Sequence, residues 1–306
     1  MKEYVVKTNN LTKTYGNIYA LNQVNINVEK GTIYGLVGDN GAGKSTLLKL
    51  LVGQSIKTSG ELYLFHSHTE KDLERERKRL GALVEHTGFY PELTVMQMLE
   101  YYRIQRGIPG KAKVNEIINT VKLDEKRNSK CKNLSLGQKQ RLGLAIALIG
   151  EPELLILDEP INGLDPSGIL EIRNLLLKLN REKNMTILLS SHILSELEHL
   201  ATSYGFLSKG RLIEEISATS LQEKCSDSIE YKVSDPASFI ALLDKYYKND
   251  VCKLLADNSI RIYNPKQLTE VYSKLAGDNN IYVLGLTTIK TSLEDYYMNL
   301  KNGGNK

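Results

Sequence analysis

The stretch GDNGAGKST, residues 38–46, has the residue types and the spacing of a phosphate-binding loop. Gly38, Gly43, Lys44 and Ser45 occupy the fixed positions of the pattern G-x-x-x-x-G-K-[ST]. The glycines let backbone N–H groups face the phosphates, the lysine reaches the β- and γ-phosphates, and the serine hydroxyl holds Mg²⁺. The other nucleotide-binding residues expected in this loop are Asn40, Gly41 and Thr46.

Two acids at the end of the apolar run LLILD, residues 154–158, supply the second half of a nucleotide site. They are Asp158, the last residue of the run, and Glu159, which follows it. The run is continuously apolar, as in a strand buried within a parallel sheet. We expect Asp158, at its end, to hold Mg²⁺ directly or through water. Glu159 can polarise the attacking water as a general base. With the phosphate-binding loop, these two acids predict a nucleoside triphosphatase.

A second phosphate-facing helix end is predicted at LSLGQKQRL, residues 134–142. Ser135 is the expected N-cap of an apolar helix. Gly137 has no side chain, so it leaves the backbone at the start of this helix uncovered. Such an end attracts anions, because its first N–H groups are unpaired and the helix dipole is positive there. We infer that two copies pack head to tail, so that each copy offers this end to the nucleotide of the other.

The elements that position these motifs predict an α/β fold. A strand at residues 33–37 leads into the phosphate-binding loop, and a helix with apolar spacing follows it and stops at Gly53. Another buried strand is expected at residues 186–190, after a helix over about residues 167–179. Strand, glycine loop and helix in this order are the start of a βαβ unit.

Two further regions of the N-terminal part have different patterns. Residues 1–37 consist of short β-type runs, and the run IYALNQVNINV, residues 18–28, alternates partly like one half-exposed strand. Residues 92–150 are predicted to be mostly helical. After about residue 219 the order of elements becomes β-α-β-β-α-β, followed by a last helix, which suggests a small ferredoxin-like α+β unit.

In their order and spacing, these motifs resemble those of ATP-binding-cassette (ABC) ATPases. LSLGQ is similar to the family signature L-S-G-G-Q, with Leu136 in place of the first glycine. NGLDP resembles the D-loop with Asp165 at its centre, and LLSSH places His192 at the switch histidine. Tyr15, in LTKTYG, resembles the aromatic residue that stacks on adenine. The resemblance covers residues 3 to about 218.

The resemblance implies an ATPase that dimerises when it binds two MgATP. The expected catalytic residues are Glu159, which polarises water, His192, which positions it, and Lys44. From the partner subunit, Ser135, Gly137 and Gln138 are expected to close over the γ-phosphate, and Asp165 of the D-loop is expected to contribute to the ATP site in trans. The implied fold is a P-loop NTPase core with a mainly parallel sheet, an N-terminal antiparallel β-subdomain and a helical subdomain.

We therefore expect two domains in this chain. Residues 1–218 form the ABC nucleotide-binding domain, with the helical subdomain at about residues 86–150. Residues 219–306 form the small C-terminal α+β domain.

Glu85 departs from the common family pattern. It stands in GALVEHTGFYPELT, residues 81–94, where most ABC ATPases have a glutamine that ligates Mg²⁺ and begins the loop contacting the membrane subunit. A carboxylate is a harder Mg²⁺ ligand than an amide. We expect Glu85 to ligate Mg²⁺; the alternative is a neutral replacement of glutamine. With GFYPELT, SLGQKQRLG, INGLDPSGI and SSHILSELE, it resembles the subfamily that protects bacteria from lantibiotics and bacitracin.

This finer resemblance implies a subunit that powers export of a peptide antibiotic or a similar amphiphile. A separate integral membrane permease would insert a coupling helix into the groove around Glu85, Phe89 and Tyr90. The ATPase would act as a homo- or heterodimer in the cytoplasm, peripherally on the inner face of the plasma membrane.

Two other functions are considered. A non-transport ABC ATPase could act on ribosomes or DNA, but the chain has a single P-loop, and residues 53–134 hold no sustained heptads. An ATP-gated sensor could bind a ligand or a sister subunit through its C-terminal domain.

The net charge, the cysteines and the apolar segments restrict the kinds of binding partner and site that this chain can have. A net charge of +4 gives no support for nucleic acid as a partner. The three cysteines, Cys131, Cys225 and Cys252, lack C-x-x-C spacing and favour reduced thiols over a disulfide framework or a zinc site. The N-terminus has no apolar segment typical of a secretory signal, and the run LGLAIALIG is too short to span a bilayer.

Overall fold

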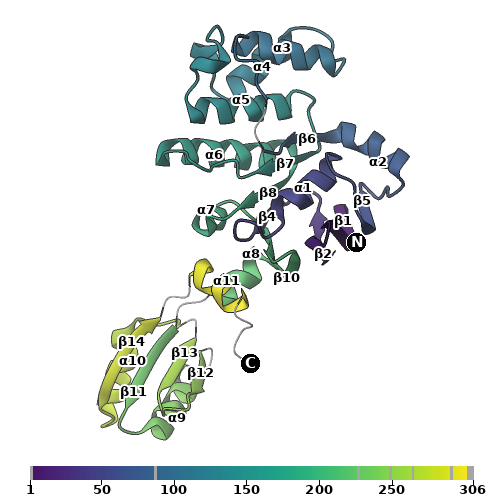
Figure 1. Cartoon of the computed structure of the whole chain (residues 1–306). Helices are drawn as coiled ribbons and strands as arrows, with labels where there is room; N and C mark the ends of the chain where they lie inside the picture. Colours follow the sequence, from purple (N-terminus) through teal and green to yellow (C-terminus); the bar gives the residue numbers. More distant parts are fainter. Residues whose placement is uncertain are drawn as a thin grey trace. The chain divides into compact units, whose positions relative to one another are not determined.

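The computed structural model in Figure 1 describes residues 3–85, 88–225, 228–247, 250–263, 265–289 and 292–301. The chain divides into two compact units, Met1–Ala218 and Thr219–Lys306. Within the described ranges, none of the helices combines the length and the apolar character needed to cross a membrane.

The first unit begins with a small antiparallel sheet in the order β2-β1-β3, and β5 also pairs with β1. Its strands are β1 (Tyr4–Tyr15), β2 (Ile18–Val24), β3 (Asn27–Glu29) and β5 (Ser59–Leu64). The prediction of one strand over residues 18–28 was wrong, because the extended conformation is interrupted between β2 and β3. Gln23 has a φ of 55°, and the Asn25 side chain accepts a hydrogen bond from the backbone N–H of Asn10 over 2.7 Å.

The second sheet of this unit has six strands in the order β10-β9-β4-β8-β7-β6. Neighbouring strands are parallel, except that β10 is antiparallel to β9. The strands are β4 (Ile33–Val37), β6 (Leu80–Leu83), β7 (Leu154–Asp158), β8 (Thr186–Ser191), β9 (Ser203–Ser208) and β10 (Arg211–Ser217). The apolar runs in β4, β7 and β8 are buried. Because these strands pair in parallel, their carboxyl ends lie at the same edge of the sheet.

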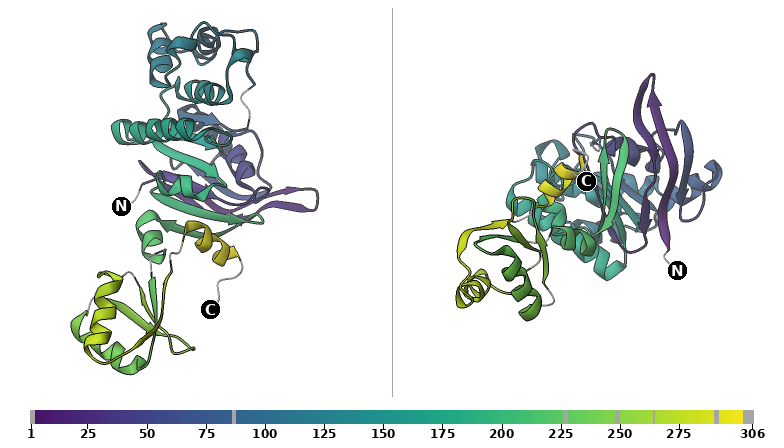
Figure 2. Two further views of the ribbon diagram at one scale, coloured as in Figure 1. Left: turned by 90° about the vertical axis from the view of Figure 1, so that its left-hand side faces the viewer. Right: turned by 90° about the horizontal axis from the view of Figure 1, so that it is seen from below.

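Helices cover this sheet and extend beyond its β6 side, where α3, α4 and α5 gather in Figures 1 and 2. The helices of this unit are α1 (Lys44–Val52), α2 (Glu70–Glu76), α3 (Val95–Gln105), α4 (Ala112–Thr120), α5 (Leu136–Leu148), α6 (Pro166–Lys183) and α7 (Leu194–Glu198). All of α8 (Ala218–Lys224) except Ala218 belongs to the second unit. Short 3₁₀ turns lie at Arg77–Arg79, Asp124–Lys126 and Cys131–Asn133. Predicted helical content over residues 92–150 is present as α3 to α5.

In the second unit, the elements β11 to β14 form an antiparallel sheet in the order β12-β13-β11-β14. The elements are β11 (Ser228–Val233), α9 (Pro236–Tyr246), β12 (Val251–Leu254), β13 (Ile260–Tyr263), α10 (Thr269–Asp278), β14 (Val283–Ile289) and α11 (Leu293–Lys301). Figure 2 shows α9 and α10 on one face of this sheet, and the core between them includes Tyr231, Phe239 and Tyr272. This order is that of a ferredoxin-like unit, as the element pattern predicted.

Candidate nucleotide site

The phosphate-binding loop joins β4 to α1 in a conformation that requires glycine. A Cβ at Gly38 would lie 2.5 Å from the Leu207 carbonyl oxygen. Gly43 is the N-cap of α1 with a φ of 109°, and a Cβ there would lie 2.5 Å from the Ala20 carbonyl oxygen. No side chain caps this helix, so its first N–H groups face the loop as an anion site.

The predicted loop residues lie together around this helix end. Asp39, Asn40 and Gly41 are exposed, whereas Lys44 is only 5% exposed. Its ammonium donates hydrogen bonds to the carbonyl oxygens of Gly38 over 2.6 Å and Asp39 over 3.2 Å. Ser45 and Thr46 follow in the first turn of α1 and are half-buried.

The two acids at the carboxyl end of β7, Asp158 and Glu159, lie next to this group. The Glu159 carboxylate lies 3.3 Å from the Lys44 ammonium, through Oε1. Its other oxygen, Oε2, lies 2.8 Å from Nδ1 of His192, which follows the end of β8. One carboxylate thus joins the loop lysine to the histidine, because β4, β8 and β7 are adjacent and end at the same edge.

Asp158 is held by a contact that the sequence reasoning missed. Asp158 pairs with Ser190 in the parallel register of β7 and β8. The Ser190 hydroxyl donates to Asp158 Oδ1 over 2.6 Å and accepts the backbone N–H of Glu159 over 3.0 Å. The sequence feature that could have pointed to Ser190 is a polar residue directly after the apolar run ILL in the strand TILLSS.

Glu85 has a partner that was also not predicted. It lies two residues after the end of β6, has a φ of 57°, and forms an ion pair with Lys49 of α1. The hydrogen bond that the Lys49 ammonium donates to the Glu85 carboxylate raises the pKa of Lys49 above its usual value. Lys49 lies one helical turn after Ser45, so this spacing was a signal that it shares the face of Ser45.

The residues expected to act in trans meet in one hollow on the surface. Ser135 caps α5 and accepts the backbone N–H of Gln138, whose side chain accepts the Ser135 N–H in return. Asp165 caps α6 and accepts the Gly168 N–H over 3.2 Å. These residues and Gly137 line a shared cavity of about 350 Å³. Leu136, in the place of a glycine in the signature, is 50% exposed.

Tyr15 lies at the end of β1 and is 52% exposed. Its hydroxyl is 3.5 Å from the Ser55 hydroxyl, and the Lys13 ammonium lies 4.7 Å from the ring centroid. An exposed aromatic face next to a cation is suited to stacking with a base.

A larger cavity of about 690 Å³ extends from the two acids towards the helical layer. Asp158 and Glu159 line one side, with Glu85 and Phe89 near them. Tyr90 does not line this cavity; it is 51% exposed and packs edge-on against Tyr101, with ring centroids 5.3 Å apart.

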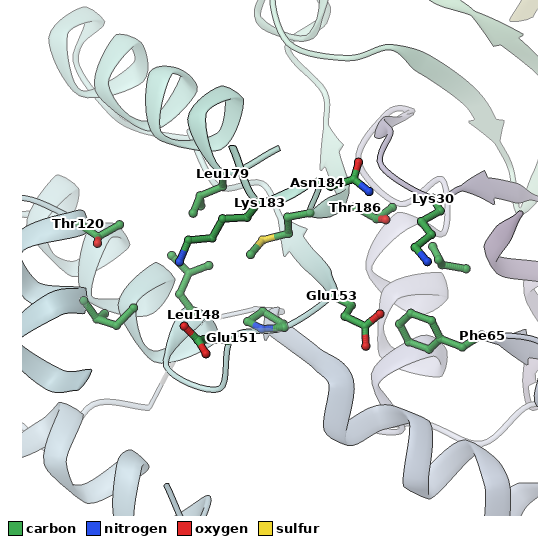
Figure 3. Close-up of a pocket in the computed structure, with 14 residues that line it drawn as sticks. Lys30, Phe65, Thr120, Leu148, Glu151, Glu153, Leu179, Lys183, Asn184 and Thr186 are labelled. Carbon is green, nitrogen blue, oxygen red and sulfur yellow. The ribbon is translucent and has the colours of Figure 1, made fainter. Parts of the chain in front are cut away.

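Figure 3 shows another cavity, of about 320 Å³, near the start of β8 and the end of α6. Its charged side chains already have ion-pair partners. Glu153 pairs with Arg79 over 2.7 Å, Glu151 pairs with Lys113, and Lys30 lies 3.2 Å from Glu3. Thr186 lines this cavity, whereas Ser190 lies near the other end of the same strand.

Comparison with known proteins assigns this chain to a family. The profile of the ABC transporter family matches residues 21–162. The bacitracin transport ATP-binding protein BcrA of Bacillus licheniformis is 40% identical over 300 residues, which cover 98% of each chain. The chain belongs to the ABC transporter ATP-binding proteins. It is an ABC-type ATPase, and the resemblance inferred from its motifs is confirmed.

Other ABC relatives and solved structures agree with this assignment. The lantibiotic transport ATP-binding protein SrtF of Streptococcus pyogenes is 42% identical over 211 residues, which cover 69% of this chain and 90% of SrtF. The post-hydrolysis dimer of the ATP-binding cassette MJ0796, bound to ADP and Pi, superposes with a TM-score of 0.64 at 28% identity. It covers 70% of this chain and 98% of that cassette. ABC ATPases bind ATP, normally with Mg²⁺, and work as dimers with membrane permeases.

Proposed function

We propose that this ABC ATPase powers the export of a peptide antibiotic, of the bacitracin or lantibiotic kind, through a separate membrane permease. The observation that carries the proposal is the 40% identity to the bacitracin transport protein BcrA over nearly the whole of both chains. This match extends into the second unit, whereas the lantibiotic relative SrtF matches 69% of the chain.

The phosphate-binding loop holds the nucleotide in this proposal. In the structure the Lys44 ammonium donates hydrogen bonds to the carbonyl oxygens of Gly38 and Asp39. When ATP binds, it exchanges these partners for the β- and γ-phosphates. Tyr15 stacks on the adenine. The remaining contacts come from the backbone or side chains of Gly38, Asn40, Gly41, Gly43, Ser45 and Thr46.

The donor groups near this loop fit Mg²⁺, which prefers oxygen ligands. The Ser45 hydroxyl and the Asp158 and Glu85 carboxylates are the residues that would hold it. When bound, the ion neutralises charge that develops on the phosphates. Since Glu85 pairs with Lys49 in the structure, this carboxylate must leave its partner to act as a ligand.

Glu159 and His192 carry the hydrolytic step. In the structure the Glu159 carboxylate forms an ion pair with Lys44 and a hydrogen bond with His192, so it is oriented from two sides. Once Lys44 moves to phosphate, one carboxylate oxygen is free to take a hydrogen bond from the attacking water. His192 then orients the carboxylate and the γ-phosphate relative to each other.

A closed dimer completes each site in this proposal. The capped start of α5 supplies a positive helix end, and Ser135, Gly137 and Gln138 of the partner subunit cover the γ-phosphate. Asp165 of the partner subunit adds the contact of the D-loop. Hydrolysis cleaves the bond between the β- and γ-phosphates, so the nucleotide no longer connects the two copies once phosphate leaves, and the dimer reopens.

The permease meets the groove around Glu85 and Phe89, on the cytoplasmic face of the membrane; Tyr90, which follows Phe89 in the chain, lies outside the groove lining. The 690 Å³ cavity that joins Glu85 and Phe89 to Asp158 and Glu159 supports this assignment, because a helix seated there is next to the catalytic acids. Movement of that helix is thereby coupled to the state of the nucleotide.

Growth of the native cell in the presence of antibiotic peptides tests this function. Replacing the chain with the Glu159→Gln variant should increase sensitivity to bacitracin-type or lantibiotic peptides, measured as the minimal inhibitory concentration. The control variant Lys57→Met removes a remote ion pair of α2 and should leave sensitivity unchanged. Equal resistance in the wild type and Glu159→Gln strains, for each peptide class, would contradict the proposed cargo.

A further inference from the structure

The strand β8 ends in two buried serines, and one of them contacts both parts of the acidic pair. Ser190 is 0% exposed, so its hydroxyl has no access to water and must bond within the protein. It donates to Asp158 Oδ1 over 2.6 Å and accepts the backbone N–H of Glu159 over 3.0 Å. The single donor and an acceptor site of one hydroxyl are both used by consecutive acids.

The backbone of Glu159 explains why such a contact matters. Its φ of 49° lies in the left-handed region, which is unfavourable for a residue that is not glycine. The next residue is Pro160, which further restricts the conformation of Glu159. Local preferences therefore oppose this conformation, and the hydrogen bond from its N–H to Ser190 holds it in place.

The same conformation fixes the direction of the Glu159 carboxylate. In it, Oε1 lies 3.3 Å from the Lys44 ammonium and Oε2 lies 2.8 Å from His192. If the peptide unit before Glu159 turned, both distances would change together. A displacement of about 1 Å at a reacting group is enough to cost about a hundredfold in rate.

We propose that Ser190 is a positioning residue for ATP hydrolysis, which locks the Asp158 carboxylate and the Glu159 backbone into one rigid unit. Ser190 does not contact the nucleotide. It acts through Glu159, so the inference rests on the proposed role of Glu159 as the base. Its loss slows the hydrolytic step and leaves nucleotide binding by the phosphate-binding loop intact.

The test compares Ser190→Ala with a matched control on the same strand. Thr186 is also 0% exposed, and its hydroxyl accepts one backbone N–H, from Gly31 over 2.9 Å, near the other end of β8. Thr186→Val therefore removes a buried hydroxyl at a distance from the acids. Both variants should lower the melting temperature by a few degrees, but only Ser190→Ala should change the chemistry.

For Ser190→Ala we expect kcat for ATP hydrolysis to fall about tenfold or more, with KM for ATP within about twofold of the wild type. ATP-induced dimerisation, followed by gel filtration, should persist. Ser190→Thr retains the hydroxyl and should restore most of kcat. If Ser190→Ala does not fold, Ser190→Cys keeps a similar volume with only a weak donor and should show the same loss of kcat.

The outcomes separate this inference from the proposed function. A kcat within twofold of the wild type in Ser190→Ala, or an equal loss in Thr186→Val, would overturn the role of Ser190. The variant Glu159→Gln is measured in parallel. If Glu159→Gln keeps its turnover, the proposed base is wrong, whatever the result at Ser190.

Discussion

The ion pair between Lys49 and Glu85 should control how readily Glu85 reaches Mg²⁺. The substitution Lys49→Met removes the ammonium and keeps an unbranched apolar side chain on α1. Glu85 then has no partner to leave before it acts as a ligand. We therefore expect hydrolysis to reach half of its maximal rate at a lower Mg²⁺ concentration.

The exposure of the two side chains sets the size of this effect. Lys49 is 29% exposed and Glu85 is 59% exposed, so water screens the pair. Ion pairs of this kind contribute about 0.2–1 kcal/mol. The upper value corresponds to about a fivefold change in an equilibrium. The half-maximal Mg²⁺ concentration should thus fall by at most about fivefold, with a melting temperature within about 4 °C of the wild type.

The assay is a Mg²⁺ titration of ATP hydrolysis for the wild type, Lys49→Met, Glu85→Gln and the double variant. Glu85→Gln should need more Mg²⁺, because an amide is a weaker ligand than a carboxylate. Lys57→Met is the matched control, since Lys57 is 30% exposed and lies 3.9 Å from Glu70 in a remote pair. An unchanged Mg²⁺ dependence in both Lys49→Met and Glu85→Gln would show that Glu85 is not a Mg²⁺ ligand and is a neutral replacement of glutamine.

Three further predictions concern other parts of the chain. Glu159→Gln should lower ATP turnover about a hundredfold or more while ATP still drives dimerisation; retained turnover in an ATPase assay would remove Glu159 from the base role. A chain that ends at residue 218 should bind a fluorescent ATP analogue like the full chain, because the first unit is compact by itself; an insoluble product would contradict this. Lys132 and Lys130 lower the pKa of Glu92 to about 2, so its small stabilising contribution is complete above its usual pKa of 4.5 and is lost as the pH falls through about 2. NMR titration of the Glu92 carboxyl measures this directly, and a midpoint near 4.5 would contradict both ion pairs.

The sequence predicted the parts of the fold that depend on strong local patterns. The glycines around Lys44 have no alternative, because a Cβ at Gly38 or Gly43 would collide with a carbonyl oxygen. The apolar runs before Asp158 and within β8 could only be buried strands, and the element order of the second unit gave its ferredoxin-like sheet. The break between β2 and β3 was missed because it depends on the side chain of Asn25, which has no periodic signal.

The site was predicted in its residues but not in its contacts. Glu159, His192 and Lys44 come from different segments, and motif order alone does not show that one carboxylate joins the other two. The contact of Ser190 with Asp158 depends on strand register, which a single sequence does not specify. Lys49 was overlooked because a lysine on an amphipathic helix is usually a solvated residue.

In the function proposed for this ATPase, it works with a membrane permease in peptide export. The most direct measurement is to tag the chain in its native cell, solubilise the membranes gently and identify what is purified with it. We expect a small polytopic permease, without an extracellular binding protein, that can then be tested with bacitracin and lantibiotics. Recovery only with ribosomes or DNA, or with no membrane protein, would contradict the claim of transport.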